Sequence, residues 1–369
     1  MSKYNKITKL LFTALTATLL TACGGGTSTS YTNTATGEEI TLGIDNPTCQ
    51  EGFATQEGKI IDSKTNKGIS NVSVEIAGCT ITTDENGFYK FSNIPSIART
   101  SVNFTKDGYL NNSKIIQIKN QTTNYLETSL STSKWDWTYN SKNGTSGGSV
   151  VISPNTVYAD NDENNYTGEI NAYYTLKNTS TTEGRDMFPG SYQGIDSNGI
   201  VVSFVSYSFL VLDLKDNKMN TLHTSGTITI EVDNIKGIKD QEIPLWYYNN
   251  DKGIWIEKGS AQKDGNGNYI CAISHPGTWS LSKPIETEMG LYRGKIVDSD
   301  ENPITNVRMQ AIGKNWITED LTTDENGVFE IYVVPNQAFT LSAYDYKEKF
   351  GAYFGDTIPA IASGDVAGE

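Results

Sequence analysis

The hexapeptide TTDENG at Thr82–Gly87 occurs a second time, unchanged, at Thr322–Gly327. A short strand-forming run follows each copy, FYKF at Phe88–Phe91 and VFEI at Val328–Ile331. The Asn-Gly pair tolerates the positive φ angles that tight two-residue hairpin turns require, and the preceding aspartate is a common turn former. The two stretches therefore predict a β-hairpin at each copy.

The similarity between the copies extends beyond the hexapeptide. GKIID at Gly58–Asp62 returns as GKIVD at Gly294–Asp298, and ISNV at Ile69–Val72 returns as ITNV at Ile304–Val307. Apolar and polar residues alternate in VSVEI at Val72–Ile76, as they do in a strand with one face on a core. The chain therefore contains two copies of one small β module.

These residues resemble the carboxypeptidase regulatory-like family, whose fold is a transthyretin-like, seven-stranded β-sandwich. The first copy keeps the family pattern through to KDGY at Lys106–Tyr109, whereas the second has DYK at Asp345–Lys347 in the corresponding place. The resemblance implies sandwich domains at 57–131 and 290–369. It also implies a structural or accessory role, because this family carries no catalytic residues of its own.

The stretch 135–284 between the copies has a different pattern. Runs rich in Val, Ile, Thr, Tyr and Trp alternate with turn-rich connections such as Asp264–Gly267, which predicts a larger antiparallel β-sandwich. Its IPLWYY run at Ile243–Tyr248 and its HPGTW ending at His275–Trp279 resemble the extracellular region of cartilage intermediate layer proteins and bacterial surface lipoproteins. The whole chain is thus predicted to be all-β, with several antiparallel β-sandwich domains in tandem.

The N-terminal residues 1–22 have the layout of a secretory signal. Three lysines precede an apolar run, Leu10–Leu20, that is too short to span a bilayer as a helix. The run ends in LTAC at Leu20–Cys23, which resembles the lipobox of bacterial lipoproteins. The resemblance implies a thioether-linked diacylglycerol on Cys23 and cleavage in front of it. Each buried CH₂ of an acyl chain adds about 0.8 kcal/mol, so several chains hold a protein firmly.

The residues after this cysteine begin with GGGTSTS at Gly24–Ser30 and stay polar. Such a composition cannot bury enough apolar surface to order itself, so we expect a flexible tether over 23–56. By the same resemblance, Gly24 behind the anchor suggests passage to the outer membrane of a Gram-negative cell. We therefore expect a lipid-anchored protein of the outer membrane or cell surface, with a periplasmic orientation left open.

The overall charge narrows the range of partners. The chain has 29 Lys and Arg against 43 Asp and Glu, and its net charge is −14. An acidic chain repels nucleic acid and anionic lipid headgroups, so neither is expected to bind. The membrane is expected to hold the protein through its lipid, and an unknown envelope protein or glycan is the expected partner.

With Cys23 modified, three cysteines remain in a compartment that permits disulfides. Cys49 lies just before the first module and Cys79 within it, which makes them the favoured pair. Closing that loop stabilises by roughly 3–4 kcal/mol in the chain-entropy model. Cys271 has the surroundings of a buried strand thiol, although a disulfide from Cys49 or Cys79 to Cys271 stays open.

Calcium is the only cofactor that the sequence suggests. Asp160, Asp162 and Asn164 place oxygen side chains at alternate positions, as loops for hard cations do. The stretch lacks the glycine at its sixth position and has Asn171 where the twelfth-position glutamate would stand. A solvated polar turn explains the same residues.

Catalytic motifs are missing from the sequence. The two histidines, His223 and His275, lie far apart and outside any zinc or serine-hydrolase motif. Trp135, Trp137 and Tyr139 alternate, so on a strand they share one face that could stack on sugar rings, or pack in a core.

We therefore expect a lipid-anchored, non-catalytic surface protein with a structural, adhesion or scaffold role. The alternative is a carbohydrate-binding lipoprotein that uses the aromatic face. A hydrolase with an unrecognised acidic site is the enzymatic alternative, and carboxylates with perturbed pKa in a deep pocket would favour it.

Overall fold

The computed structural model describes residues 28–37, 39–43, 52–133, 137–140, 145–147, 149–159, 165–233, 235, 237–345 and 350–368. The expected signal peptide and the expected lipidation site, Cys23, lie outside the described residues. The described chain is all-β and consists of several β-sandwich domains in tandem. The described residues contain one α-helix, α1 (Thr182–Met187). No described helix is both long and apolar enough to cross a bilayer.

The first module is a seven-stranded sandwich around one core. A three-stranded sheet in the order β6-β3-β9 faces a four-stranded sheet in the order β5-β4-β7-β8. The strands are β3 (Ala54–Asp62), β4 (Ser73–Ile76), β5 (Cys79–Thr82), β6 (Phe88–Ile94), β7 (Ile97–Thr105), β8 (Asn112–Ile118) and β9 (Thr123–Leu130). Its first strand starts three residues before the expected boundary at 57, because Ala54 is already a fully buried core residue.

The second module repeats this topology strand for strand. Its sheets have the orders β26-β23-β29 and β25-β24-β27-β28, and β29 pairs in parallel with β23 as β9 does with β3. The strands are β23 (Gly290–Lys295), β24 (Arg308–Ile312), β25 (Leu321–Thr322), β26 (Val328–Val333), β27 (Thr340–Asp345), β28 (Phe350–Phe354) and β29 (Val366–Gly368). The internal duplication seen in the sequence is therefore a duplication of the fold.

The repeated TTDENG hexapeptide does not form the predicted β-hairpin, because the strands on its two sides belong to different sheets: β5 pairs with β4, and β6 pairs with β3. It forms a turn with a three-residue loop that carries the chain from one sheet of the sandwich to the other. The Asp84 carboxylate accepts the backbone N–H groups of Asn86 (2.8 Å) and Phe88 (2.9 Å), and Gly87 closes the loop at φ 83°. The same contacts recur at Asp324. The aspartate is thus a turn former, and the glycine provides the left-handed residue that three-residue loops need.

The second threonine of the hexapeptide connects the turn to the opposite loop. The Thr83 hydroxyl donates to the carbonyl of Ile69 (2.6 Å) and accepts from the N–H of Val72 (2.9 Å). The equivalent hydroxyl of Thr323 makes the same two bonds in the second module. These threonines satisfy backbone groups that the sheets leave without a partner.

The central unit, which the sequence predicted to be an antiparallel sandwich, consists of one large sheet around its own core and a separate two-stranded sheet of β13 and β17. The sheet joins eleven of the described strands, and β15 pairs in parallel with β20. The strands of this unit are β10 (Trp137–Asn140), β11 (Thr145–Gly147), β12 (Val150–Ile152), β13 (Val157–Ala159), β14 (Glu169–Asn178), β15 (Gln193–Ile195), β16 (Val201–Lys215), β17 (Leu222–Thr224), β18 (Ile228–Val232), β19 (Glu242–Asn249), β20 (Ile254–Lys263), β21 (Tyr269–Ile273) and β22 (Gly277–Pro284).

The long strand β16 contributes to two hydrophobic clusters. Before residue 206 its even-numbered residues, such as Phe204, face a cluster shared with the second module. Between Ser206 and Ser208 the register with β22 shifts at a β-bulge. Beyond the bulge Phe209 faces that same cluster and Leu210 faces the core of the central unit. The bulge therefore changes the residues of this strand that face the shared cluster from even-numbered to odd-numbered ones.

The segment expected as a flexible tether is partly ordered, which corrects the sequence prediction. Residues 28–43 contain a hairpin of β1 (Ser28–Thr32) and β2 (Glu39–Gly43). Its turn residue Asn33 is fully buried and donates to Ser203 Oγ at 3.0 Å, and Ile40 packs on Ile254. The amino-acid composition did not predict this order, because the hairpin is stabilised by its contacts with the central unit and not by a core of its own.

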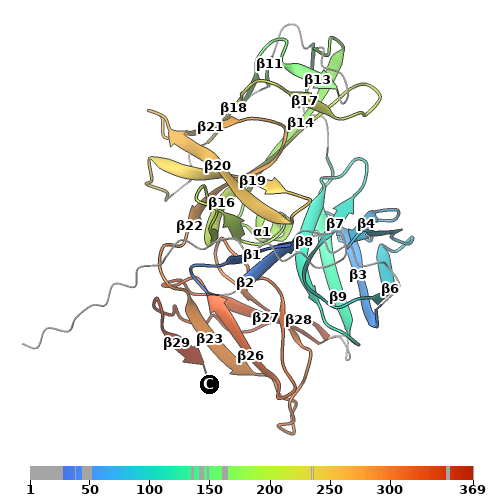
Figure 1. The fold of residues 1–369 in the computed structure, drawn as a ribbon, viewed down its shortest axis with the longest axis vertical. Helices are drawn as coiled ribbons and strands as arrows, with labels where there is room; N and C mark the ends of the chain where they lie inside the picture. The colour runs from blue at the N-terminus through green and yellow to red at the C-terminus, as the bar shows by residue number, and fades with distance from the viewer. Residues whose placement is uncertain are drawn as a thin grey trace, which may run out of the picture.

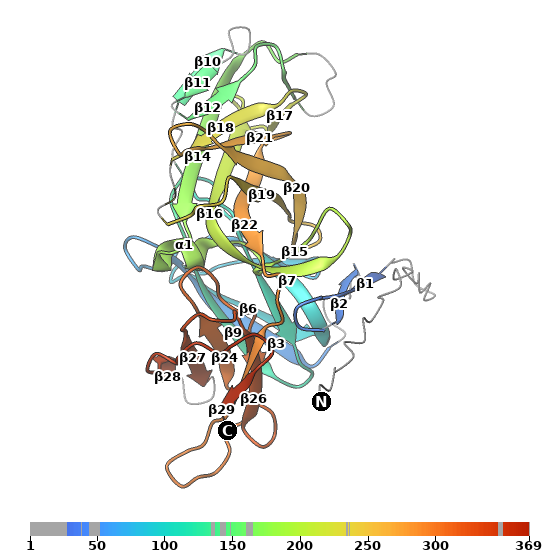
Figure 2. The same ribbon diagram turned by 90° about the vertical axis from the view of Figure 1, so that its left-hand side faces the viewer.

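Both modules lie against the same end of the central unit (Figures 1 and 2). Tyr248 of the central unit donates to Ser113 of the first module at 2.8 Å. Arg185 donates to the carbonyl of Lys314 in the second module, also at 2.8 Å. The modules contact each other as well, through Lys119 and Thr322. The three units therefore share one junction.

Candidate functional site

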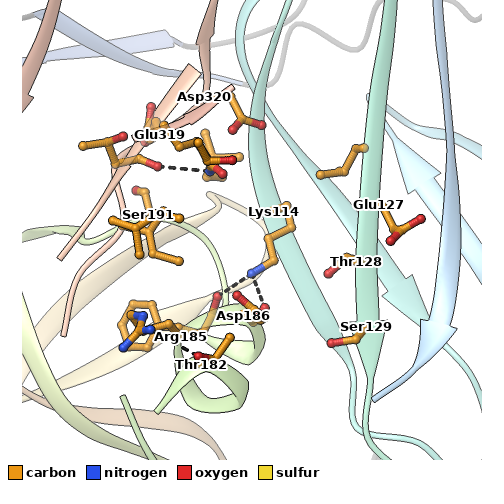
Figure 3. A pocket seen from close by; sticks show the side chains of 18 of the residues that line it. Lys114, Glu127, Thr128, Ser129, Thr182, Arg185, Asp186, Ser191, Glu319 and Asp320 are labelled. Carbon is orange, nitrogen blue, oxygen red and sulfur yellow. Dashed lines mark hydrogen bonds between the residues drawn. The ribbon is translucent and has the colours of Figure 1, made fainter. Parts of the chain in front are cut away.

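A cleft of about 650 Å³ opens at the junction of the three units (Figure 3). The first module lines it with β8 and β9, the central unit with α1 and the residues that follow, and the second module with β24 and the segment Ile317–Asp320. A second cleft, of about 520 Å³, shares this segment and Tyr192 with the first. The site is thus built from residues that lie far apart in the sequence.

Lys114 extends from β8 toward the C-terminal end of α1 (Figure 3). Its amine donates to the carbonyls of Asp186 (2.6 Å) and Phe188 (3.0 Å), which belong to the carbonyl groups that a helix end leaves unsatisfied. Burial in the cleft lowers the pKa of Lys114 to about 8, and the carboxylates of Asp186 and Asp320 act in the opposite direction. Lys114 therefore fastens the first module to the central unit.

One ion pair connects the second module to the first, and another lies within the second module beside it. Arg308 Nε lies 2.7 Å from Asp320 Oδ2, and Arg99 Nε lies 3.5 Å from Glu319 Oε1. Arg99 also donates to the carbonyl of Gly253 at 3.1 Å, so one guanidinium of the first module contacts both other units. Burial raises the pKa of Asp320, while Arg308 stabilises its charged form. Removing one partner of such a pair leaves an uncompensated charge and is strongly destabilising.

Some polar atoms in the cleft have no partner among the described residues. The Tyr192 side chain is 8% exposed, and neither its hydroxyl nor Asp320 Oδ1 has a hydrogen-bond partner there. Tyr192 stacks on Phe188, with ring centroids 4.3 Å apart. Tyr125 and Tyr344 stack on each other across the two modules at 5.4 Å. The cleft thus combines aromatic rings with hydrogen-bonding groups, as ligand sites do.

The cleft contains carboxylates with a perturbed pKa, the feature that was expected to favour a hydrolase with an acidic site. Asp186 and Asp320 both line it, and burial raises the pKa of each. Each is nevertheless opposed by a cation: Lys114 favours the ionised form of Asp186, and Arg308 that of Asp320. Lys114 and Asp186 come from different units, whereas Arg308 and Asp320 form an ion pair within the second module.

The predicted aromatic face is not supported at Tyr139. This side chain is 9% exposed and packs in the core of the central unit beside Ile170, its partner on β14. Trp135 lies outside the described residues, and Trp137 is described only as the first residue of β10. The alternation of the three residues could not distinguish a ligand face from a core, and Tyr139 belongs to the core.

The candidate calcium loop, with Asp160, Asp162 and Asn164, lies outside the described residues. Among the residues that the structure does describe, no three His, Cys, Asp or Glu side chains gather as metal ligands. His275 makes a local hydrogen bond, since its Nδ1 lies 2.8 Å from the carbonyl oxygen of Pro276.

Of the two cysteines among the described residues, one is disulfide-bonded and one is free. Cys79 is part of a disulfide, and Cys271 is free and fully buried. The alternative pairing with Cys271 is therefore wrong. Cys49 lies outside the described residues, so its bond to Cys79 stays a prediction.

Sequence reasoning did not find the residues of the cleft. Lys114, Arg99, Arg308 and Asp320 come from separate strands and loops, and none belongs to a motif. Periodicity identifies which residues face a core within one unit, but it carries no information about which surfaces of different units meet.

Comparisons with known proteins leave the family open. No protein-family model matches the chain, and no curated protein matches it. Among solved structures, the TIE protein of Bacillus anthracis is 13% identical with a TM-score of 0.20, over 89% of this chain and 51% of that one. BcpA, the major pilin subunit of Bacillus cereus, is 10% identical with a TM-score of 0.18, over 84% of this chain and 95% of that one. The major pilin SpaD of Corynebacterium diphtheriae is 10% identical with a TM-score of 0.20, over 81% of this chain and 88% of that one.

The chain spans about half the length of the TIE protein. TM-scores of this size assign neither a family nor a function.

Proposed function

We propose that the protein is a lipid-anchored, non-catalytic component of the bacterial envelope or cell surface, with a structural, adhesion or scaffold role. The LTAC sequence at Leu20–Cys23 supports the anchor. The observation that carries the role is the junction, where Arg99 and Lys114 of the first module bind groups of the other two β units. A protein that bridges partners benefits from such a junction, because its units keep a fixed relative position.

Metabolic labelling with an alkyne-bearing fatty acid tests the anchor. Cells that express the full chain with a C-terminal tag should incorporate the label, and Cys23→Ser should abolish it. Cys271→Ser is the matched control, since that thiol is buried in the central unit and should not affect labelling. Labelling that persists in Cys23→Ser would refute the anchor.

Protease treatment of whole cells tests the surface display. If the protein faces outward, its tag is lost from intact cells while a periplasmic marker survives. Protection of the tag until the outer membrane is permeabilised would place the protein on the periplasmic side and contradict an adhesive role.

A second candidate function is capture of a glycan in the cleft. The specific observation is the buried Tyr192 hydroxyl without a partner in a space that aromatic and polar side chains line together. In affinity electrophoresis against a panel of polysaccharides, the migration of the protein should be retarded, and Tyr192→Phe should reduce that retardation. Trp135→Ala should reduce it only if the glycan binds the face of Trp135, Trp137 and Tyr139 instead. Retardation by no polysaccharide rules out glycan capture, and release of new reducing ends would instead indicate a hydrolase.

A further inference from the structure

The second cleft of the junction, of about 520 Å³, contains buried polar atoms that nothing among the described residues satisfies. Gln193 Oε1 and the Tyr192 hydroxyl both line it without a hydrogen-bond partner. Asp320 lines it as well: its Oδ2 lies 2.7 Å from Arg308 Nε, whereas its Oδ1 has no partner. Such atoms are few in native structures, because each one costs stability unless water or a ligand binds it. The cleft therefore has three atoms available to a ligand.

These three atoms favour a ligand that donates hydrogen bonds. Gln193 Oε1 and Asp320 Oδ1 can only accept, since the first is an amide oxygen and the second belongs to a carboxylate in an ion pair. The Tyr192 hydroxyl can accept or donate. Two further atoms of the cleft without a hydrogen bond, Arg99 Nε and Glu319 Oε1, lie 3.5 Å apart as an ion pair. Acceptors therefore outnumber donors among the atoms that remain.

The charged side chains that line the cleft are mostly acidic. One basic side chain stands against four acidic ones, namely Arg99 against Glu39, Glu319, Asp320 and Glu330. Arg293 and Arg308 pair with two of these acids from outside the lining, and an excess of acidic groups remains. A cleft with an excess of one charge concentrates ligands of the opposite charge. The lining therefore favours a cation.

Aromatic rings in the same lining narrow the kind of cation. The rings are those of Tyr192, Phe204, Trp316 and Tyr332. Organic cations are attracted to the faces of such rings, and an aliphatic chain packs against them. Within the described segments, no three His, Cys, Asp or Glu side chains are grouped as metal ligands. An organic ammonium group therefore fits this cleft better than a metal ion does.

The loop that carries Asp320 is longer in the second module than in the first. The segment 77–78 joins β4 to β5, whereas the segment 313–320 joins β24 to β25. The longer loop is held from inside, because Trp316 is only 2% exposed and its Nε1 donates to Gln337 Oε1 at 3.1 Å. A loop fixed in this way needs little further ordering when a ligand binds.

We propose that the second cleft binds a primary ammonium group on a short aliphatic chain. An ammonium group has three donors and no acceptor, which matches the available atoms of Gln193, Asp320 and Tyr192. A sugar hydroxyl brings acceptors together with its donor, and the Tyr192 hydroxyl is the one donor among the three available atoms. The same chemistry is carried by a free diamine and by a lysine side chain of another protein. This site does not depend on the lipid anchor.

Isothermal titration calorimetry on the full chain tests the ligand class. Cadaverine represents a free diamine, and Nα-acetyl-lysine methylamide represents a lysine side chain within a polypeptide. The neutral control is the diol of the same length as cadaverine, with hydroxyl groups in place of both amines. In about 0.3 M NaCl, which screens adsorption to the acidic surface, we expect saturable binding of the amines and roughly tenfold weaker binding of the diol. The tighter of the two amines identifies the source.

Two substitutions remove an available atom of the cleft without changing the charge of the chain. Gln193→Leu removes Oε1 and Tyr192→Phe removes the hydroxyl, and neither atom has a partner among the described residues, so the circular dichroism melt should stay near that of the parent. We expect each variant to bind the amine roughly three- to tenfold more weakly. Glu127→Gln is the matched control: it removes a charge from the first cleft, does not affect the lining of the second, and should bind normally.

The outcomes separate this proposal from glycan capture and from adsorption. If the diol binds as tightly as cadaverine, the cleft takes neutral polyols and the proposal is wrong. Unchanged affinity in Gln193→Leu and Tyr192→Phe, or an equal loss in Glu127→Gln, would assign the binding to the overall charge and overturn the site. Binding of neither amine would overturn it as well. None of these outcomes affects the lipid-labelling test.

Discussion

Replacing Thr83 by valine removes a hydroxyl while keeping the shape of the side chain. Thr83 is 3% exposed, and its hydroxyl is the partner of the Ile69 carbonyl and the Val72 N–H, both on buried residues. A buried group left without a partner costs about 1–3 kcal/mol. With partial relaxation of the loop, we expect Thr83→Val to lower the free energy of unfolding by about 2–4 kcal/mol.

Two comparisons make this expectation specific. Thr83→Ser keeps both hydrogen bonds and loses one methyl group, which costs about 1 kcal/mol. Thr323→Val breaks the same two bonds in the second module, but Ile304 is half-buried there and water can reach its carbonyl, so we expect about 1–2 kcal/mol.

Urea denaturation measures the stability of all three variants. Circular dichroism near 215 nm is used to follow it, because the first module contains no tryptophan whose fluorescence could report its unfolding. The expected order of destabilisation is Thr83→Val, then Thr323→Val, with Thr83→Ser affected least. A Thr83→Val protein that is as stable as Thr83→Ser would refute the role given to this hydroxyl, and equal losses at the two threonines would refute the argument from solvent access.

The remaining predictions concern turns, a buried amine and the disulfide. Met219 and Glu301 take the position of Gly87 in two further aspartate turns, at φ 69° and 65°, so Met219→Gly and Glu301→Gly should each stabilise by about 0.5–1 kcal/mol in urea, whereas Gly87→Ala should destabilise. The folded pKa of Lys114 is lowered to about 8, so the unfolded chain binds more protons above that pH, and the parent should gain stability relative to Lys114→Met between pH 8 and 10. A stability difference that is flat over this range would contradict the burial of the amine. Reduction and Cys49→Ser should each cost roughly 3–4 kcal/mol and not add, whereas Cys271→Ser should leave the sensitivity to reductant intact.

The repeat made most of the architecture predictable from sequence. The copies around Thr82–Gly87 and Thr322–Gly327 predicted two related β modules, and the structure contains two sandwiches of identical strand order. The alternation of apolar and polar residues predicted strands within each unit, since it reflects which face of a strand is buried. It left two interpretations open at Tyr139, because alternation looks the same for a face that binds a ligand and a face that lines a core.

Features that depend on contacts between units could not be predicted. Asn33 sits in a polar stretch that reads as a tether, yet it is fully buried because Ser203 lies opposite. Lys114 and Asp320 look like ordinary surface charges in the sequence, and only the docking of the three units buries them. The turn type was missed for a local reason: Asn-Gly suits two-residue loops, but the Asp84 carboxylate organises a longer one.

The hydrophobic cluster that β16 shares with the second module affects how the protein unfolds. Phe204 and Trp255 of the central unit belong to the same cluster as Met309 and Phe329 of the second module, and Leu110 adds a residue from the first. A break between these units would expose the interior of both at once. Calorimetry on the intact chain should therefore resolve fewer transitions than there are domains, and a fragment cut near residue 284 should be poorly soluble, because the cut runs through a shared interior and not through a linker.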